Sequence, residues 1–300
     1  MYLSSVHILS LQFITLMKKH FSYLVLLAFS AFLISSCDII EEPVRQGGGN
    51  TGGGGGEVEE AVQRVLIEKF TGHRCNNCPN AEVTSTQIKN TFGDKIVVVS
   101  YHVLDNFAGP TSKLPDDWRT PEGTAIFNFY RFFGIPVGMV NRLNYTSTGT
   151  GHMKQHGGWA THVQSELDND PLFDIRIKTE WDNASRNASV DIDIEALENY
   201  SEELVLSVFV IENNIIAPQI LPNYDVDEEY VHNYMFRQSL SHHFGEDIGT
   251  NIWARGAVET YSKSEQLGSG LEASNLYIVT FLRNKANHKV VQVAQKKLID

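Results

Sequence analysis

The sequence predicts an α/β domain followed by an all-β sandwich domain, and three observations support this prediction. A strand-like segment leads into a Cys-x-x-Cys pair, Cys75 and Cys78, and a helix-like segment follows the pair. The next segment, KIVVVSY at residues 95–101, is a continuous apolar run typical of a strand buried on both faces. After residue 170 the chain changes to short segments of alternating apolar and polar residues, which is typical of an antiparallel sandwich.

The start of the chain carries an export signal. Residues 21–34 form an apolar stretch that follows two lysines and ends in Ser35-Ser36-Cys37. A stretch of this length is typical of a secretory signal, because a helix that crosses a bilayer needs about 20 apolar residues. The last residues resemble the lipobox of bacterial lipoproteins. We therefore expect residues 1–36 to be the signal-peptide region, with the true translation start at Met17. We expect Cys37 to be lipidated after cleavage. An uncleaved anchor with an incidental cysteine is the alternative.

A tether is expected between the lipid and the folded part, over residues 37–60. Eight glycines stand within residues 47–56, and such a segment behaves as a flexible linker. A lipid on Cys37 also accounts for the odd count of three cysteines. The localisation that follows is the cell envelope, with the membrane as a partner through the lipid anchor at Cys37.

The charge of the chain argues against two classes of partner. The formal net charge is -12, from 24 basic and 36 acidic residues. Nucleic-acid binding usually requires a basic face, so no nucleic acid is expected as a partner. The chain also lacks a polybasic segment for anionic lipid.

The cysteine pair lies in a strand–helix–strand context. Residues 62–70 predict a strand, residues 80–92 a helix and residues 95–101 a second strand. A Cys-x-x-Cys pair near a βαβ pattern is typical of a thioredoxin-like domain, which we place at residues 61–168. The helix start favours a thiolate, because its backbone N–H groups point toward the cysteines. Cys75 is then the expected exposed nucleophile and Cys78 the buried resolving thiol, with His73 and Arg74 lowering the thiol pKa.

A second part of the expected site lies downstream. Thioredoxin-like domains carry a cis proline before a strand that lies opposite the cysteine pair, and Pro136 before the apolar residues 137–140 matches that position. Between the cysteine pair and Pro136 we expect a loop over 102–118. His102 follows the end of a strand, and we expect it to be a packed or solvent-facing residue; the alternative is that it reaches the edge of the site. A helix should run from Thr120 to about Phe133, and the last helix of this domain from Gly151 to Leu167.

The C-terminal half, residues 169–300, reads as about seven short strands of immunoglobulin-like type. The expected strands begin at residues 173, 190, 204, 230, 257, 276 and 290. No catalytic group stands out there. Around one strand and its following loop stand His232, Arg237, His242 and His243. We expect the histidines to be exposed loop residues, and a ligand site is the alternative. The acidic connection 213–229 leaves a calcium site open, although it lacks the spacing of an EF-hand.

The motifs together resemble those of a known family. FTGHRCNNCP at 70–79, RTPEG at 119–123 and the segment from Gly134-Ile135-Pro136 to Asn141-Arg142 are similar to the 28-kDa outer membrane protein family of Gram-negative bacteria. The resemblance implies an outer-membrane lipoprotein with a thioredoxin-like domain and a β-rich C-terminal part, and an adhesin-like role has been suggested for the family. The chain departs from thioredoxin in having no tryptophan before Cys75 and Asn76-Asn77 between the cysteines.

Two functions remain open at this point. The first is thiol-disulfide exchange on exported protein thiols or with a redox partner, in which Cys75 attacks, Cys78 resolves and Pro136 shapes the peptide groove. The second is a non-enzymatic surface binding protein in which the Cys75–Cys78 disulfide is static. We expect no cofactor and no metal. A c-type haem is excluded, because Pro79 stands where its motif requires histidine. A zinc site would need His73, His102 or His242-His243 in addition to the pair.

Overall fold

Two parallel strands and the helix between them form the first part of the fold. In the computed structural model, which describes residues 61–145, 151–249 and 252–299, β1 is Val65–Thr71, α2 is Cys78–Phe92 and β2 is Ile96–His102. The two strands pair in parallel along their whole length. Nearly every residue in them is buried, because helices cover both faces. The helix ends at Gly93, whose positive φ and backbone N–H to Lys89 close the last turn.

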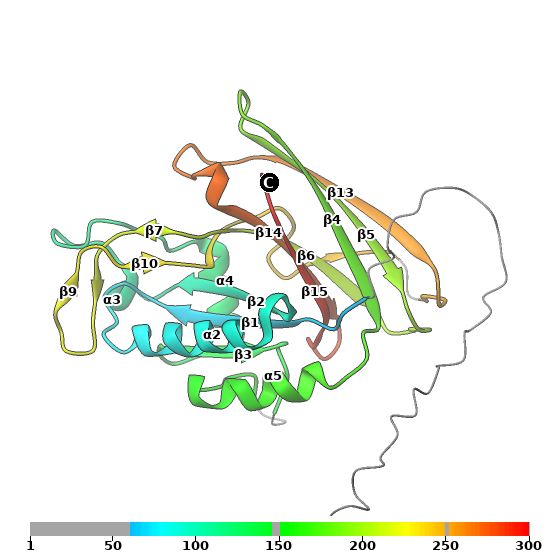
Figure 1. Ribbon diagram of the computed structural model, residues 1–300, viewed down its shortest axis with the longest axis horizontal. Helices are drawn as coiled ribbons and strands as arrows, with labels where there is room; N and C mark the ends of the chain where they lie inside the picture. Colours follow the sequence, from blue (N-terminus) through cyan, green and yellow to red (C-terminus); the bar gives the residue numbers. More distant parts are fainter. Residues whose placement is uncertain (1–60, 146–150, 250–251, 300) are drawn as a thin grey trace, which may run out of the picture. The chain divides into compact units, whose positions relative to one another are not determined.

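A third strand and two helices complete this part. The strand β3, Val137–Val140, pairs antiparallel with the free edge of β1. Helix α5, Trp159–Leu167, packs with α2 on one face of these strands, and α4, Pro121–Phe129, packs on the other (Figure 1). Residues of β1 alternate between the two cores, so that Ile67 lies on the side of α2 and Leu66 on the side of α4. Thr120 caps α4 by accepting a hydrogen bond from the Gly123 backbone.

The sheet continues into the C-terminal half of the chain. Its order is β15-β14-β6-β11-β2-β1-β3, and β12 pairs with β6 in addition. The joining strand β11 lies beside β2, with Met235 opposite Ser100 and the Ser100 backbone N–H donating to the Tyr234 carbonyl at 2.7 Å. The bounds are β6 Leu204–Glu212, β11 Met235–Ser239, β12 Glu246–Asp247, β14 Leu276–Asn284 and β15 Val290–Lys297.

A second sheet covers one face of the C-terminal strands. It consists of β4, Phe173–Asp182, β5, Asn187–Ala196, and β13, Val258–Gln266, in the order β13-β5-β4. The core between the two sheets holds apolar side chains from both, including Val190 and Ile192 of β5 and Val208 and Val210 of β6. The strict alternation of buried residues in β5 reflects this one-sided packing. Figure 1 shows the long strands β4, β5 and β13 above β6, β14 and β15.

Four very short strands connect β6 to β11. They are β7 Ile215–Ile216, β8 Gln219–Ile220, β9 Val226–Asp227 and β10 Val231–His232. β7 pairs with β10 and β8 with β9. We call residues 213–234 the cover segment, because they lie over the cysteine pair. The remaining short elements are the helix α3, Asp105–Ala108, and single 3₁₀ turns at Gly93–Lys95, His156–Gly158 and Ala273–Asn275.

The prediction of an α/β part followed by a β-rich part is confirmed. The expected boundary at 168/169 falls between α5 and β4, yet Val58–Asp300 is one compact unit, because β11 joins both parts into one sheet. Two helix bounds differ from the expectation. α4 ends at Phe129 rather than near Phe133, because Arg131 has φ +55° and leaves the helix. α5 begins only at Trp159, after the two glycines of a 3₁₀ turn.

Candidate functional site

The cysteine pair lies where β1 ends and α2 begins. Cys75 and Cys78 form a disulfide with a Cα–Cα distance of 5.4 Å. The loop turns tightly, since the Cys75 backbone N–H donates to the Gly72 carbonyl and that of Cys78 donates to the Cys75 carbonyl. Cys78 is the first residue of the 15-residue helix α2, and Pro79 follows it, where the missing N–H costs no helical hydrogen bond.

The loop before the pair is held against α3. A Cβ atom on Gly72 would lie 2.2 Å from the carbonyl oxygen of Phe107, so only glycine permits this approach. The Arg74 backbone N–H donates to that same carbonyl at 2.9 Å. The Arg74 guanidinium donates to the carbonyls of Asp105 and Gly109. The positive charge that we expected beside the cysteines therefore lies against the backbone of α3 and of the residue that follows it.

The disulfide is buried, so the expectation of an exposed Cys75 is wrong for this structure. Cys75 is 2% exposed and Cys78 is 3% exposed. The cover segment is bonded to the loop that carries the pair. The Gln219 side-chain amide donates to the Cys75 carbonyl at 3.2 Å, and the Ile220 backbone N–H donates to the His73 carbonyl at 2.9 Å. The sequence carried no local signal for this contact, because residues 213–229 read as an acidic connection far from the pair.

Three histidines gather around Trp118, with His73 and His102 beneath the cover segment and His232 on the inner side of that segment. The ring centroids of His73, His102 and His232 lie 5.4, 5.1 and 4.8 Å from that of Trp118. All three histidines are at most 5% exposed, so His232 is not the exposed loop residue that we expected. Both ring nitrogens of His73 and of His102 lack a hydrogen-bond partner within the described part of the chain. The other two histidines expected there, His242 and His243, lie outside this cluster, and their rings stack on each other.

Burial dominates the electrostatics of this cluster. It lowers the pKa of His73, lowers that of His102 well below its usual range and lowers that of His232 to about 4. Burial also lowers the pKa of Lys69 to about 7, although Lys69 forms an ion pair with Glu82 of α2. The three imidazoles are therefore neutral at pH 7.

A small cavity connects the histidines to the disulfide. Its volume is about 10 Å³, which is close to the space that one water molecule needs. Its lining residues include Cys78, Glu82, Gln219, His102 and His232. The cavity thus brings residues of the cysteine pair, the histidine cluster and the cover segment around one small space.

Pro136 lies near the same end of strand β1 as the cysteine loop. The Ile135–Pro136 peptide bond is cis. In the antiparallel pairing of β1 with β3, Val137 lies opposite Phe70, so Pro136 falls beside the end of β1. The structure therefore places the cysteine pair and Pro136 near the same end of β1. Cys37 lies outside the described residues.

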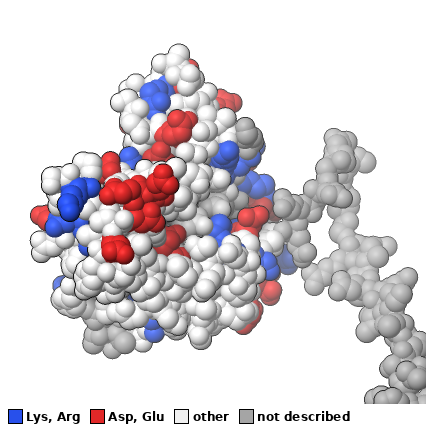
Figure 2. Space-filling model, turned by 60° about the vertical axis from the view of Figure 1, so that its left-hand side comes forward, with Lys and Arg blue, Asp and Glu red and all other residues white. Residues whose placement is uncertain are grey.

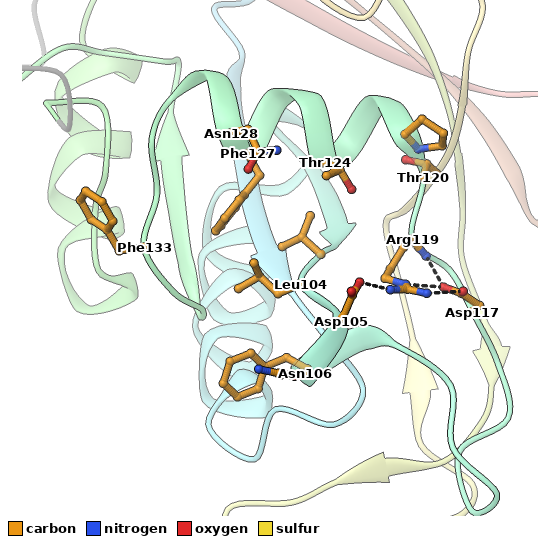
Figure 3. Close-up of a pocket in the computed structure, with 13 residues that line it drawn as sticks. Leu104, Asp105, Asn106, Asp117, Arg119, Thr120, Thr124, Phe127, Asn128 and Phe133 are labelled. Atoms are coloured by element: carbon orange, nitrogen blue, oxygen red, sulfur yellow. Dashed lines mark hydrogen bonds and ion pairs between the residues drawn. The ribbon is translucent and has the colours of Figure 1, made fainter.

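A larger groove opens next to α3. It measures about 830 Å³ and lies between α3 and α4, with Arg119 at one end and Phe133 at the other (Figure 3). Arg119 is ion-paired with Asp105 and with Asp117, as the dashed lines of Figure 3 mark. Phe133 is 84% exposed. Residues lining the groove are Val103, Leu104, Asp105, Asn106, Phe107, Asp117, Arg119, Thr120, Pro121, Thr124, Phe127, Asn128 and Phe133.

The described residues do not assemble a metal centre. Within them, no group of three or more His, Cys, Asp or Glu side chains is arranged to hold an ion. This finding covers the acidic residues of the cover segment, where Asp225 pairs with Asn223 and Asp227 caps the Glu229 backbone. Figure 2, which turns that side of the molecule forward, shows acidic side chains gathered on it. No helix in the described ranges is long and apolar enough to cross a membrane.

Comparisons with known proteins agree with this architecture. A family model described as "Outer membrane protein Omp28" matches residues 124–300. No curated protein matches the chain. Among solved structures, HBP35 of Porphyromonas gingivalis is similar with a TM-score of 0.63 at 17% identity, over 80% of this chain and 76% of that one, and so shares the fold.

Two other structures are less similar. A protein from Agrobacterium tumefaciens gives a TM-score of 0.45 at 15% identity, over 81% of this chain and 97% of that one. A domain of the outer membrane lipoprotein Omp28 from Porphyromonas gingivalis gives a TM-score of 0.28 at 17% identity, over 43% of this chain and 90% of that one.

Proposed function

The chain belongs to the family of outer membrane protein Omp28, and we propose that its Cys75–Cys78 pair exchanges disulfides with the thiols of exported proteins. Membership of the family makes the chain an outer membrane lipoprotein. The lipid attachment at Cys37 and the signal peptide before it are part of the proposal. Intact mass of the mature protein tests them, because the diacylglyceryl group must map to an N-terminal Cys37.

The observation that carries the redox proposal is the position of the pair at the start of α2. A disulfide in the turn between β1 and a following helix, with parallel β2 next along the chain, is the arrangement of a thioredoxin-like site. The cis bond before Pro136, next to the end of β1, supports the same assignment. The helix N-terminus stabilises a negatively charged sulfur when the disulfide is opened.

The exchange follows ordinary thiol chemistry. A substrate thiolate attacks the sulfur of Cys75, the Cys75–Cys78 bond breaks, and its electron pair leaves on the sulfur of Cys78. A second substrate thiolate then attacks the substrate sulfur of the mixed disulfide and releases Cys75 as a thiolate. The substrate loses two electrons and forms its disulfide, and the protein gains two. The reverse sequence reduces a substrate disulfide by the same steps.

Trapping of mixed disulfides tests the two roles. With Cys78→Ser the thiolate of Cys75 attacks a peptide disulfide, one peptide sulfur leaves as a thiolate, and Cys78 is absent to resolve the mixed disulfide, so covalent complexes with a disulfide-containing peptide should accumulate. With Cys75→Ser the attacking sulfur is absent, so trapping should be weaker. Equal trapping by both variants contradicts the roles, and no trapping by either contradicts exchange.

One observation favours a second function, a non-enzymatic binding protein with a structural disulfide. The pair is 2–3% exposed beneath Gln219, which limits access for a protein thiol. The groove between α3 and α4 would then be the surface that meets a ligand. The reduction potential separates the two functions: a value below about -300 mV favours a structural bond, and a value between those of thioredoxin and disulfide isomerase favours exchange.

A further inference from the structure

The cover segment is built as a small unit of its own. Its two ends are held together, since the Tyr234 backbone N–H donates to the Asn213 side chain at 2.7 Å and the Asn214 N–H donates to the Asn233 side chain at 3.0 Å. Inside it, β7 pairs with β10 and β8 with β9. A segment that pairs internally and is closed at its base can move about that base without unfolding the sheet beneath it.

Its contacts with the cysteine loop are few. The hydrogen bonds of Gln219 and Ile220 to the backbone of Cys75 and His73 join the two. Ala217 and His232 also pack on Trp118. At its base the segment is fixed, because the Tyr234 and Asn233 carbonyls accept from the Ser100 backbone N–H and hydroxyl and the Asn213 N–H donates to the Asn275 carbonyl. Movement about this fixed base breaks the hydrogen bonds of Gln219 and Ile220 and exposes the cluster around Trp118.

The site around His73, His102 and His232 accommodates neutral imidazole rings and opposes their protonation. His73 and His102 have four ring nitrogens without a partner within the described residues, although both side chains are at least 96% buried. His232 reaches the Ala217 carbonyl at 3.3 Å, within the cover segment itself. A charged imidazole here would lie beside another imidazole, because the ring centroid of His102 is 6.1 Å from that of His73 and 5.8 Å from that of His232. The carboxylate that lines the same cavity, Glu82, is already ion-paired with Lys69.

The surrounding charges do not change this conclusion. Lys69 of β1 and Arg237 of β11 oppose protonation of His102, and Lys69 also opposes that of His232. For His73, Arg74 and Arg119 oppose protonation, whereas Asp116 and Asp117 favour it less strongly than burial opposes it. Glu82 faces the cavity but is ion-paired with Lys69, and Tyr230 contacts His232 by its ring.

We propose that residues 213–234 are a pH-sensitive cover, which opens when His232 on its inner side and His73 and His102 beneath it are protonated, and which thereby exposes the Cys75–Cys78 disulfide. The cover concerns access to the disulfide, so it stands apart from whether the disulfide turns over.

The direction of the pH effect follows from proton linkage. The closed form lowers the histidine pKa values, so the open form binds more protons between the lowered values and about 6.5. The closed form is fully stable above pH 7.5 and loses stability as the pH falls below 6.5. With a pKa of about 4 closed and 6.5 open, His232 alone increases the open fraction about 30-fold from pH 8 to pH 5.

Hydrogen–deuterium exchange of the mature protein tests the proposal. Exchange rates, corrected for the chemical effect of pH, are compared at pH 7.5 and 5.0 for peptides within 213–234 and for β14 as a control. We expect exchange to rise at least tenfold in the cover segment, including the Ile220 amide, with little change in β14. No rise, or an equal rise in β14, overturns the proposal.

Two variants sharpen the test. His232→Phe keeps an aromatic ring beside Trp118 but cannot be protonated, so the pH response of the cover segment should shrink by about tenfold or more. His242→Phe, outside the cluster, should leave the response unchanged. If His232→Phe does not fold, the pH response of the wild-type protein tests the proposal. A second measurement supports it: the rate at which a phosphine reduces the disulfide, divided at each pH by the rate at which the same phosphine reduces oxidised glutathione. A rate ratio that does not rise between pH 7.5 and 5.0 also overturns the proposal.

Discussion

The side-chain amide of Gln219 donates a hydrogen bond to the backbone carbonyl of Cys75, 144 residues away in the sequence. The amide is 3% exposed, and its nitrogen also reaches the Ile220 carbonyl. This contact brings the C-terminal half of the chain onto the disulfide that the N-terminal half forms. It makes Gln219 the natural place to test how the disulfide is protected.

Gln219→Ala should loosen the cover segment at neutral pH. The substitution removes one of the two donors to the Cys75 carbonyl, since the Cys78 backbone N–H remains, and the loss of this hydrogen bond costs the closed form about 0.5–1.5 kcal/mol. The rate at which a phosphine reduces the disulfide at pH 7.5 should therefore rise by roughly two- to tenfold. Asn223→Ala, in the same segment but exposed and bonded only to Asp225, should leave the rate unchanged.

Replacing both cysteines with alanine should leave the fold intact. The disulfide closes a loop of only four residues, so the chain-entropy estimate of its stabilisation is about 2 kcal/mol. Chemical unfolding of Cys75→Ala/Cys78→Ala should show a loss of that size in a cooperative transition. Loss of cooperative unfolding would mean that the disulfide holds the cover segment and the sheet together.

Glu68→Gln should destabilise the protein strongly. Both Glu68 and Arg142 are fully buried, and the guanidinium donates to both carboxylate oxygens at 2.6 and 2.7 Å. Removing the carboxylate leaves a buried guanidinium without its counter-charge, at a cost of about 3–5 kcal/mol. Urea unfolding measures this cost. Lys178→Met, which breaks the exposed pair with Asp193, should cost less than about 1 kcal/mol.

Gly138→Ala should also destabilise the fold, by about 1–3 kcal/mol. A Cβ atom there would lie 2.5 Å from the Trp159 ring and 2.6 Å from the Glu68 carbonyl oxygen, and neither can withdraw from the packed core. Gly134→Ala is the matched control, because its Cβ would meet no described atom within 4 Å. A thermal melt in which both variants lose equal stability would contradict this explanation.

Local patterns predicted the elements around the cysteines well. The strand expected at 95–101 is β2 at Ile96–His102, and the helix expected at 80–92 is α2 at Cys78–Phe92. These elements follow from apolar runs, Pro79 and Gly93, all of which act within a few residues. Val290–Lys297 likewise forms the strand that its apolar residues predict.

The pairing of strands that are far apart in the sequence could not be predicted from such local patterns. Tyr230 to Arg237 was expected to form a strand, and β11 does begin at Met235, but nothing in its pattern names β2 as a neighbour. The burial of His232 and of the cysteine pair depends on that pairing. A histidine in an acidic connection reads as exposed until the strand after it places the connection over another part of the sheet.

The insertion of β11 beside β2 also has a consequence for how the chain folds after export. Until residue 235 has emerged, the apolar strand β2 has an unpaired edge, and such an edge is a template for aggregation. A fragment that ends at residue 168 keeps that edge open permanently. The first half of the chain thus depends on the second for solubility, and delivery to the membrane must keep the whole chain protected until its last strands are available.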